Sequence, residues 1–397
     1  MTQEQWRDKL QPDELPIFRH TAQRLRELAP KRDEISARDV ATVVLADPFA
    51  TLQVLHAINK KVMQRYGTEV LTVEHALMMQ GLGVYLSAAT RLPILEDTPA
   101  GKDAKRLAAM QNLARLAQHA AWQARDFAVL HTDVRAEEVE VAALLAFIPE
   151  MLLWLRLPEL GKAVRRIQRR QGADALQAAL GLPFKAWRVQ VLEDWSIPPA
   201  TLDLLDEKNA ERARQIIVAA CLDISVRSAR GWWDDLLLPD YIALAGVENT
   251  PMEDIIATAH VNAARAARYG DWLPQPAAAT WGPMIPGPWP PDEDDEDLIS
   301  ATRTAPAASA SNPAAPPVAA PAPEDEGHDI CPMPDKQVLR EALQGIEGHL
   351  DGSLTLNQMS AIILKGLHTG LGLSRIVFAM VTPDGNRIKS RFTLGVP

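Results

Sequence analysis

The sequence has very little cysteine. Only Cys221 and Cys331 occur among 397 residues, and their separation provides neither a disulfide framework nor the close pairs of a zinc site. Such scarcity fits the reducing environment of the cytoplasm. The first ten residues are polar and charged, unlike a signal peptide, and no apolar run approaches the roughly 20 residues that span a bilayer. We therefore expect a soluble, cytoplasmic protein without membrane association.

The chain also lacks an excess of positive charge. It has 41 lysines and arginines against 51 aspartates and glutamates, which gives a formal charge of −10. This balance argues against general affinity for nucleic acid, because the phosphates of a nucleic acid require a basic surface. Glycine-rich phosphate loops and dinucleotide fingerprints are absent as well. The sequence therefore predicts no cofactor.

The first two thirds of the chain have a helical pattern. From about residue 16 to residue 269, apolar residues recur at helical spacing, and strand-like alternation is rare. Asp47 followed by Pro48 is typical of a helix start, and Thr72 is another suitable first cap. Single helices are predicted over residues 71–82 and 136–155. With no repeat of fixed length, we predict a mainly α protein in which residues 1–273 form a compact multi-helix bundle.

The composition changes abruptly over residues 274–334. Half of the 30 prolines lie there, together with many alanines and an acidic run from Asp292 to Asp297. Such a segment buries too little apolar surface to offset the conformational entropy lost on folding. We therefore expect a disordered linker that is rich in proline, alanine and acidic residues.

Residues 335–397 have the pattern of a small α+β unit. Two amphipathic helices are expected over residues 338–350 and 354–371. Two strands are expected over residues 376–381 and 387–394, with a tight turn that contains Asp384-Gly385 between them. A lone hairpin is marginally stable in water, so this unit has the character of the front part of a larger domain.

Several motifs, taken in order, resemble a known family. They are the Asp47-Pro48 helix start, a leucine-rich helix that ends near Asn59, the Gly81-Leu82-Gly83 turn, and the Trp195-Ser196-Ile197-Pro198 element. In this order they are similar to the HDOD domain, a non-catalytic relative of the HD phosphohydrolases that occurs in bacterial signalling proteins. The resemblance covers about residues 16–247 and implies an HDOD-like helical bundle.

The same resemblance indicates where a metal site would lie in an HD enzyme. The His-Asp pair of such enzymes corresponds to Ala146 and Phe147, a further histidine to Phe184, and a third polar position loosely to Cys221. A methyl or phenyl group offers no oxygen, nitrogen or sulfur ligand. His119 lies in a helix where an HD enzyme could place a ligand, but we expect an ordinary partly buried or surface histidine. We predict no catalytic, metal-binding or cofactor-binding residue.

The C-terminal unit is similar to the opening of a GAF domain. The resemblance rests on the helix that carries Leu364 and Leu367, the Gly370-Leu371-Gly372 turn, and the hairpin around Asp384-Gly385. A GAF-like module implies sensory input. A whole GAF domain would continue with further strands and helices, so we interpret residues 335–397 as an incomplete GAF-like module with no assigned ligand.

One charge pattern points to a candidate interaction surface. Five basic residues follow the i, i+3, i+4, i+7, i+8 spacing of a single helix face, with Val164 and Ile167 on the opposite face. These are Lys162, Arg165, Arg166, Arg169 and Arg170. The simpler interpretation is a solvated face. The functional one is binding of an acidic partner, with an intramolecular contact to the acidic run of the linker as a further hypothesis.

Together these observations predict a cytoplasmic signal-transduction scaffold that is not an enzyme and that binds other signalling proteins. Two alternatives remain open at this point. The first is a divergent HD-type metal-dependent phosphodiesterase. The second is a regulator that binds nucleic acid through the basic face between residues 162 and 170.

Overall fold

The computed structural model describes residues 3–32, 34–129, 135–169, 173–206, 212–229, 231–282, 335–347, 356–371, 373, 375–381 and 388–395. The chain divides into two compact units, residues 1–300 and residues 301–397, and each is considered by itself. Among the described residues, no helix has both the length and the apolar character needed to cross a membrane.

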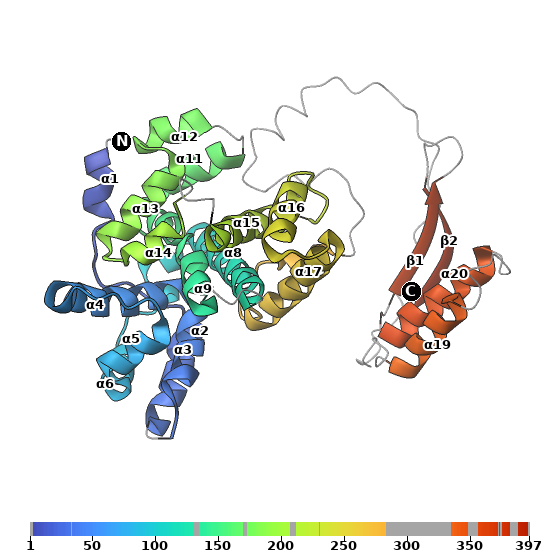
Figure 1. Cartoon of the computed structure of the whole chain (residues 1–397), viewed down its shortest axis with the longest axis horizontal. Helices are drawn as coiled ribbons and strands as arrows, with labels where there is room; N and C mark the ends of the chain where they lie inside the picture. The colour runs from blue at the N-terminus through green and yellow to red at the C-terminus, as the bar shows by residue number, and fades with distance from the viewer. Residues whose placement is uncertain are drawn as a thin grey trace, which may run out of the picture. The chain divides into compact units, whose positions relative to one another are not determined.

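The first unit is a bundle of α-helices (Figure 1). In chain order, its longer helices are α1 (Gln3–Lys9), α2 (Arg19–Leu28), α3 (Ala37–Leu45), α4 (Pro48–Tyr66), α5 (Val73–Gln80), α6 (Leu82–Ala89), α8 (Ala104–Val129), α9 (Ala136–Leu145), α10 (Ile148–Arg156), α11 (Pro158–Arg169), α12 (Ala173–Leu180), α13 (Phe184–Asp194), α15 (Ala213–Ser228), α16 (Leu237–Glu248) and α17 (Met252–Tyr269). The shorter helices are α7 (Pro99–Lys102), α14 (Pro199–Asp203) and the 3-10 turns η1 (Ala29–Lys31), η2 (Leu95–Asp97) and η4 (Ala278–Trp281). The mainly α fold predicted from the sequence is therefore confirmed.

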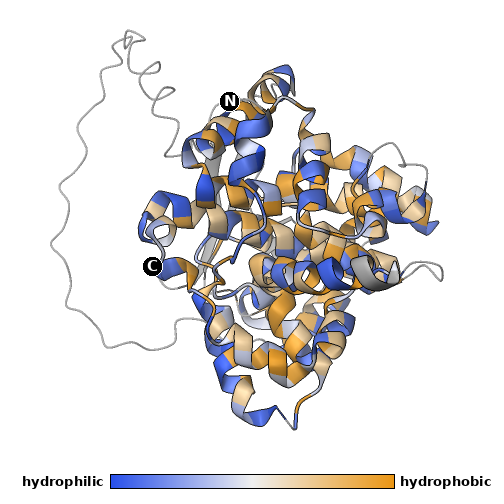
Figure 2. Cartoon of the chain, turned by 90° about the vertical axis from the view of Figure 1, so that its left-hand side faces the viewer, coloured by the Kyte–Doolittle hydropathy of each residue, from blue (hydrophilic) through white to orange (hydrophobic). Residues whose placement is uncertain are grey.

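Helix α8 is the central element of this unit. It packs against α9, α10, α15 and α17, and Figure 1 shows α9, α15 and α17 beside it. Its buried alanines between Ala114 and Ala128 allow these neighbours to approach closely, because a methyl group keeps two helix axes near one another. Apolar residues, orange in Figure 2, alternate with polar ones along the helices, as expected for amphipathic helices around a shared interior.

The interior consists of two adjoining hydrophobic clusters. One joins the N-terminal helices with α10 and α13, and the other joins α8, α9, α15, α16 and α17. The residues that link α9 to α10 lie where the clusters meet: Leu145 and Ile148 belong to the first, and Ala146 and Phe147 to the second. The predicted single helix over residues 136–155 is therefore wrong. It is broken at Ala146–Phe147, so that consecutive side chains enter two different clusters.

The helix start at Asp47 is confirmed. One carboxylate oxygen accepts hydrogen bonds from the backbone N–H groups of Phe49 (3.0 Å) and Ala50 (3.2 Å), and the other accepts from the N–H of Phe18 (2.8 Å). Pro48 occupies the first helical turn, where its missing N–H leaves no hydrogen bond unmade. Burial raises the pKa of Asp47 to about 6, while these hydrogen bonds oppose the rise. The residue therefore caps α4 and joins it to the start of α2.

The helix predicted over residues 71–82 begins as expected but ends early. Thr72 caps α5 by accepting a hydrogen bond from the N–H of His75. Gly81, with φ +86°, ends it, and α6 begins at Leu82. A positive φ suits glycine best, so the helix ends at Gly81 and does not continue through Leu82 as predicted.

The packed part of the first unit extends beyond the predicted boundary at residue 273. The indole N–H of Trp232 donates to the carbonyl of Ala278 (2.9 Å), and that of Trp281 donates to the carbonyl of Ala229 (2.6 Å). These bonds hold η4 against α15 and α17. Residues 278–281, which the sequence assigns to the linker, therefore belong to the packed unit, and residues 283–334 of the predicted linker lie outside the described residues.

The second unit has two helices, α19 (Lys336–Glu347) and α20 (Leu356–Lys365), and a π-helical turn, η5, over Gly366–Gly370. Strands β1 (Arg375–Val381) and β2 (Ile388–Gly395) pair antiparallel, with Arg375 opposite Gly395 and Val381 opposite Ile388. One residue of β2, Arg391, falls between Phe392, the partner of Phe378, and Ser390, the partner of Ala379, which makes a bulge. The predicted order of two helices and a hairpin is confirmed; the turn with Asp384 lies outside the described residues.

Candidate functional site: the hollow beside Ala146

At the break between α9 and α10, apolar side chains occupy the positions where the resemblance to HD enzymes implies metal ligands. Ala146 is the C-cap residue of α9, and Phe147 is the N-cap residue of α10. Both side chains are buried. Pro149 in the first turn of α10 has no N–H to donate, which suits the start of a new helix here. At the two expected ligand positions, the side chains therefore offer only carbon and hydrogen atoms.

An arginine lies beside both phenylalanines of the expected ligand set. The guanidinium carbon of Arg188 lies 5.3 Å from the ring centre of Phe147 and 4.6 Å from that of Phe184. Phe184 begins α13 and Arg188 follows one turn later, so the two share a helix face. The structure thus brings two of the expected positions together around a guanidinium cation, which both rings attract through their faces.

The charge of Arg188 is balanced by Glu150, from the first turn of α10. The Nε of Arg188 donates to both carboxylate oxygens, at 3.0 and 3.2 Å, and its Nη2 also donates to Oε1. Only 6% of the Glu150 side chain and 16% of the Arg188 side chain are exposed. Burial raises the pKa of Glu150, whereas Arg188 and a hydrogen bond with Gln168 lower it. The fork of the guanidinium matches the carboxylate and offsets much of its lost hydration.

A hollow opens beside this corner and holds about 570 Å³ of space, part of which is open solvent. Its lining combines apolar side chains with two positive and two negative ones. These residues are Ala146, Lys185, Arg188, Leu204, Leu205, Asp206, Gln215, Val218, Ala219, Leu222 and Asp223. Cys221, the fourth expected position, is buried in the second cluster, and burial raises the pKa of its thiol. A buried, protonated thiol is a poor metal ligand.

Gln215 is the most unusual residue of this lining. It is buried, and its side-chain nitrogen donates to the Asp203 carboxylate (3.0 Å) and to the Asp203 carbonyl (3.3 Å). Because both partners only accept hydrogen bonds, the amide orientation is fixed, with Nε2 toward Asp203. The amide oxygen is then buried without a partner among the described residues. An unpaired buried acceptor has a free-energy cost of about 1–3 kcal/mol.

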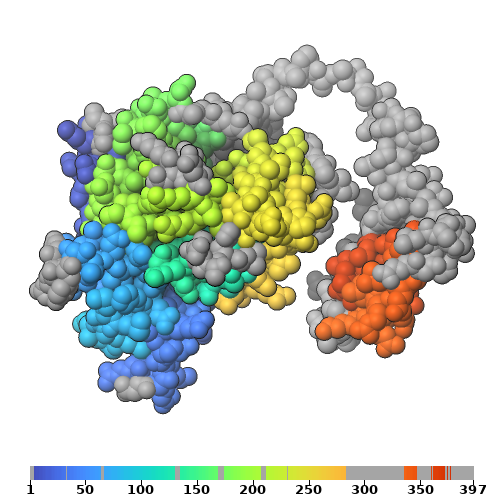
Figure 3. Space-filling view, in the orientation of Figure 1, coloured from blue at the N-terminus to red at the C-terminus, as the bar shows by residue number. Residues whose placement is uncertain are grey.

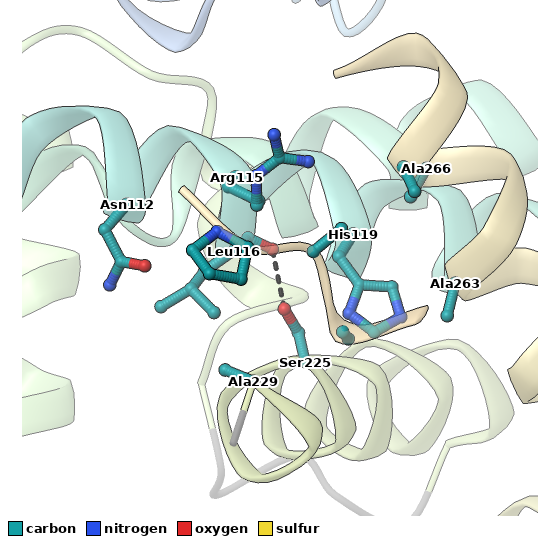
Figure 4. Close-up of a pocket in the computed structure, with 12 residues that line it drawn as sticks. Asn112, Arg115, Leu116, His119, Ser225, Ala229, Ala263 and Ala266 are labelled. Carbon is teal, nitrogen blue, oxygen red and sulfur yellow. Dashed lines mark hydrogen bonds between the residues drawn. The ribbon is translucent and has the colours of Figure 1, made fainter. Parts of the chain in front are cut away.

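A second, smaller hollow of about 340 Å³ lies between α8, α15 and α17, next to His119 and Ser225 (Figure 4). His119 is buried, and burial lowers its pKa to about 4, so its ring is neutral at pH 7. Its Nε2 lies 2.9 Å from the Nε2 of Gln123. The hydroxyl of Ser225 donates to the carbonyl of Leu116 (2.7 Å), as the dashed line in Figure 4 shows. His119 is thus more buried than expected, and the hydroxyl of Ser225 is hydrogen-bonded to a backbone carbonyl.

Metal ligands do not gather in the part of the chain that the structure describes. No group of three or more His, Cys, Asp or Glu side chains there is arranged to hold a metal ion.

The predicted interaction surface lies on α11, which is amphipathic as expected. Val164 is buried and Ile167 packs against the core, whereas Lys162 and Arg166 are exposed. Helix α11 lies at the upper edge of the first unit in Figures 1 and 3. Lys162 already pairs with Glu159 at 2.9 Å, and exposed pairs of this kind are weak.

The remaining basic residues of α11 are less uniform. Arg165 is half-buried and has an interaction of its own. Arg169 ends α11, and its side chain, like all of Arg170, lies outside the described residues. The structure thus places Lys162 and Arg166 on an exposed face, separate from the residues that line the hollow beside Ala146.

Sequence reasoning missed Arg188, Glu150 and Gln215. Glu150 directly follows Pro149, and Arg188 stands four residues after Phe184, so each lies one short step from a position that was singled out. The contact between them joins residues 38 apart in the chain. Only the packing of α10 against α13 makes that pair visible.

The chain is similar to one family of known proteins and to several solved structures. The model of the HDOD domain family matches residues 15–210. None of the curated proteins compared with the chain matches it. One similar solved structure is the MmoQ response regulator from Methylococcus capsulatus, with 19% identity over 62% of this chain and 98% of that one, at a TM-score of 0.47.

Two further solved structures are similar. A virulence factor from Campylobacter jejuni has 14% identity over 68% of this chain and 100% of its own, at a TM-score of 0.43. An HDOD domain protein with unknown function from Geobacter sulfurreducens has 16% identity over 66% of this chain and 94% of its own, at a TM-score of 0.35.

Proposed function

Because residues 15–210 form an HDOD domain, we propose that this chain is a non-enzymatic signal-transduction scaffold of the cytoplasm that acts by binding other proteins. The observation that carries the proposal is the arrangement around Arg188. At the positions that correspond to HD-enzyme ligands, Phe147 and Phe184 flank a guanidinium that is paired with the buried Glu150.

This arrangement is incompatible with a metal ion in the same place. A divalent cation beside Arg188 would be repelled by the guanidinium, and it would compete with Arg188 for Glu150. The phenyl groups would supply it with no ligand. The guanidinium of Arg188 therefore already balances the charge of Glu150. We infer that the domain keeps the helical scaffold without metal-dependent chemistry.

The proposed partner surface is the exposed basic face of α11. Lys162 and Arg166 extend from a helix whose other face, through Val164, is anchored in the core. A rigid helix with positive side chains presents a fixed pattern to an acidic partner and accelerates encounter with it. We also propose that the acidic run of residues 292–297 competes for this face from within the chain, since a tether raises the effective concentration to roughly millimolar.

The test is capture of partner proteins by the full chain from extracts of its native cell. We expect a defined set of signalling proteins to be retained at low salt, and the charge reversals Lys162→Glu and Arg166→Glu together to reduce their recovery at least about tenfold. Lys60→Glu with Lys61→Glu provides a matched control, because these two lysines are also exposed on a helix, α4. Equal recovery by both double variants would refute the role of α11.

The second unit is proposed to supply the input. Its two helices and antiparallel hairpin agree with the opening of a GAF-like module. We propose that a signal received by such a module reaches the helical unit through the segment between them. Deletion of residues 335–397 would then change partner recovery in the capture assay, and unchanged recovery would contradict this proposal.

A further inference from the structure

Helix α16 carries apolar residues on the face that it turns to solvent as well as on the face that it turns to the core. We propose that two copies of this chain pair through this outer face, with their α16 helices antiparallel about a twofold axis. Helix α16 begins at Leu237, beyond the residues that match the HDOD family model. Such a dimer goes beyond the proposed function, because its surface is separate from the basic face of α11.

Helix α16 lies at the edge of the first unit, where its main neighbours are α15 and α17 (Figure 1). Leu237, Tyr241 and Leu244 are buried in the second hydrophobic cluster. Leu238 and Ile242 lie on the outer face, and they are 49% and 57% exposed. A helix that is apolar on all sides is usually enclosed by protein. The outer face of α16 therefore has the composition of an interface.

Charge complementarity favours a second copy as the occupant of this face. From Leu236 to Val247 the only charged residue is Asp240. It is buried, and its carboxylate accepts a hydrogen bond from Arg227 (2.7 Å). The outer face thus offers no ion pair to a partner of either sign, but it brings no like charges together when it packs against its own copy. This matters for a chain with a formal charge of −10, whose copies repel each other at longer range.

The shape of the outer face is self-complementary as well. Leu238, Ile242 and Gly246 are spaced i, i+4, i+8, so they form one ridge of the helix surface, of the kind that packs most often between helices. Outside its own helix, no described atom lies within 4 Å of the position that a Cβ of Gly246 would take. In an antiparallel pair centred on Ile242, the Leu238 side chain of one copy therefore lies over the open space at Gly246 of the other copy.

The contact is small, so we expect a weak dimer. One face of a helix of 12 residues is smaller than the roughly 800 Å² that each partner buries in a standard interface. Such a contact fits association in the micromolar range. Dimerisation would place two α11 faces in one particle and so raise the avidity for a partner with two acidic segments.

Sedimentation velocity of the full chain over a range of concentrations tests the proposal. We expect a reversible monomer–dimer equilibrium with a dissociation constant of roughly 10 µM. Because the contact is apolar, this constant should change less than about threefold between about 0.05 M and about 0.5 M salt, whereas partner capture through α11 weakens with salt. A chain that stays monomeric at roughly 200 µM, or one whose mass rises beyond that of a dimer, would overturn the proposal.

Three single variants locate the contact. Ile242→Glu brings two like charges together at the twofold axis, so it should weaken dimerisation at least about tenfold. Val84→Glu is the matched control, since Val84 is 64% exposed on α6, and it should leave the dissociation constant unchanged. Gly246→Leu adds a side chain where the single chain has open space. It should weaken dimerisation at least about tenfold without lowering the melting temperature, because leucine favours a helix more than glycine does.

An exchange of the large and the small position tests the antiparallel pairing. In the double variant Leu238→Ala with Gly246→Leu, the added leucine of one copy lies over the shortened side chain of the other copy. Dimerisation should therefore regain most of the affinity that Gly246→Leu alone loses. Dimerisation that withstands Ile242→Glu or Gly246→Leu would refute the role of α16, and a double variant no better than Gly246→Leu would refute the antiparallel pairing. Each of these failures would leave partner capture through α11 untouched.

Discussion

Replacement of Arg188 by methionine tests the stabilising role of the ion pair beside Ala146. Methionine keeps apolar contact with Phe147 and Phe184 but leaves the Glu150 carboxylate buried without its cation. Only 6% of the Glu150 side chain is exposed, so water cannot replace the lost hydrogen bonds. Removal of one partner of a buried pair costs about 3–5 kcal/mol. We expect Arg188→Met to lower the free energy of unfolding by about 3 kcal/mol, because Arg188 retains slight exposure.

The assay is urea denaturation at pH 7, followed by tryptophan fluorescence and by circular dichroism. Arg7→Met is the matched control, since Arg7 pairs with Asp194 but has a side chain that is 44% exposed. It should change the free energy of unfolding by less than about 1 kcal/mol. The double variant Arg188→Met with Glu150→Gln should regain part of the lost stability, because the unpaired charge is gone. Equal effects of Arg188→Met and Arg7→Met would refute the argument that the pair is buried and structurally required.

Three other predictions follow from the described residues and the composition. Burial lowers the pKa of His119 from 6.5 to about 4. Between pH 6.5 and pH 4, His119 is therefore protonated in the unfolded chain but largely neutral in the folded chain, and this difference lowers the stability of the folded chain as the pH falls. Relative to His119→Gln, the native chain should therefore lose about 3 kcal/mol of stability between pH 6.5 and pH 4, and parallel pH profiles of unfolding free energy would contradict this. Asn59→Ala should lower the free energy of unfolding by about 2 kcal/mol in urea denaturation, because the Asn59 amide holds the N–H and the carbonyl of Val70, each at 2.9 Å; no loss of stability would show that this bridge is dispensable. Limited proteolysis should cut first within residues 283–334, as their composition indicates, whereas first cleavage within residues 40–230 would contradict the domain assignment.

The sequence predicted those features of the fold that depend on neighbours in the chain. Asp47 and Thr72 could be recognised as caps because the groups they satisfy lie two or three residues away. The hairpin of the second unit was predicted because alternation and the Asp-Gly pair are local signals. The break at Ala146–Phe147 was missed even though Pro149, in the first turn of α10, is a local signal of a helix start. That neighbouring side chains enter two separate hydrophobic clusters has no such local signal.

The candidate site was predictable only in outline. The resemblance located Ala146, Phe147 and Phe184, yet it gave no reason to place Arg188 between the two rings. The orphaned oxygen of Gln215 arises from a hydrogen bond to Asp203 across the ends of two helices, α14 and α15. The boundary at residue 273 was too early for a similar reason, because the bonds of Trp232 and Trp281 that hold residues 278–281 are long-range contacts.

The central claim is that an ion pair, and no metal ion, completes the site beside Ala146. Its most direct test incubates the full chain with excess Mn²⁺ or Zn²⁺, removes unbound metal, and then measures metal content together with hydrolysis of bis(p-nitrophenyl) phosphate. We predict substoichiometric metal that does not change in Glu150→Gln, and turnover no faster than the metal-containing buffer alone. Stoichiometric metal that is lost in Glu150→Gln, together with metal-dependent turnover by the native chain, would contradict the account.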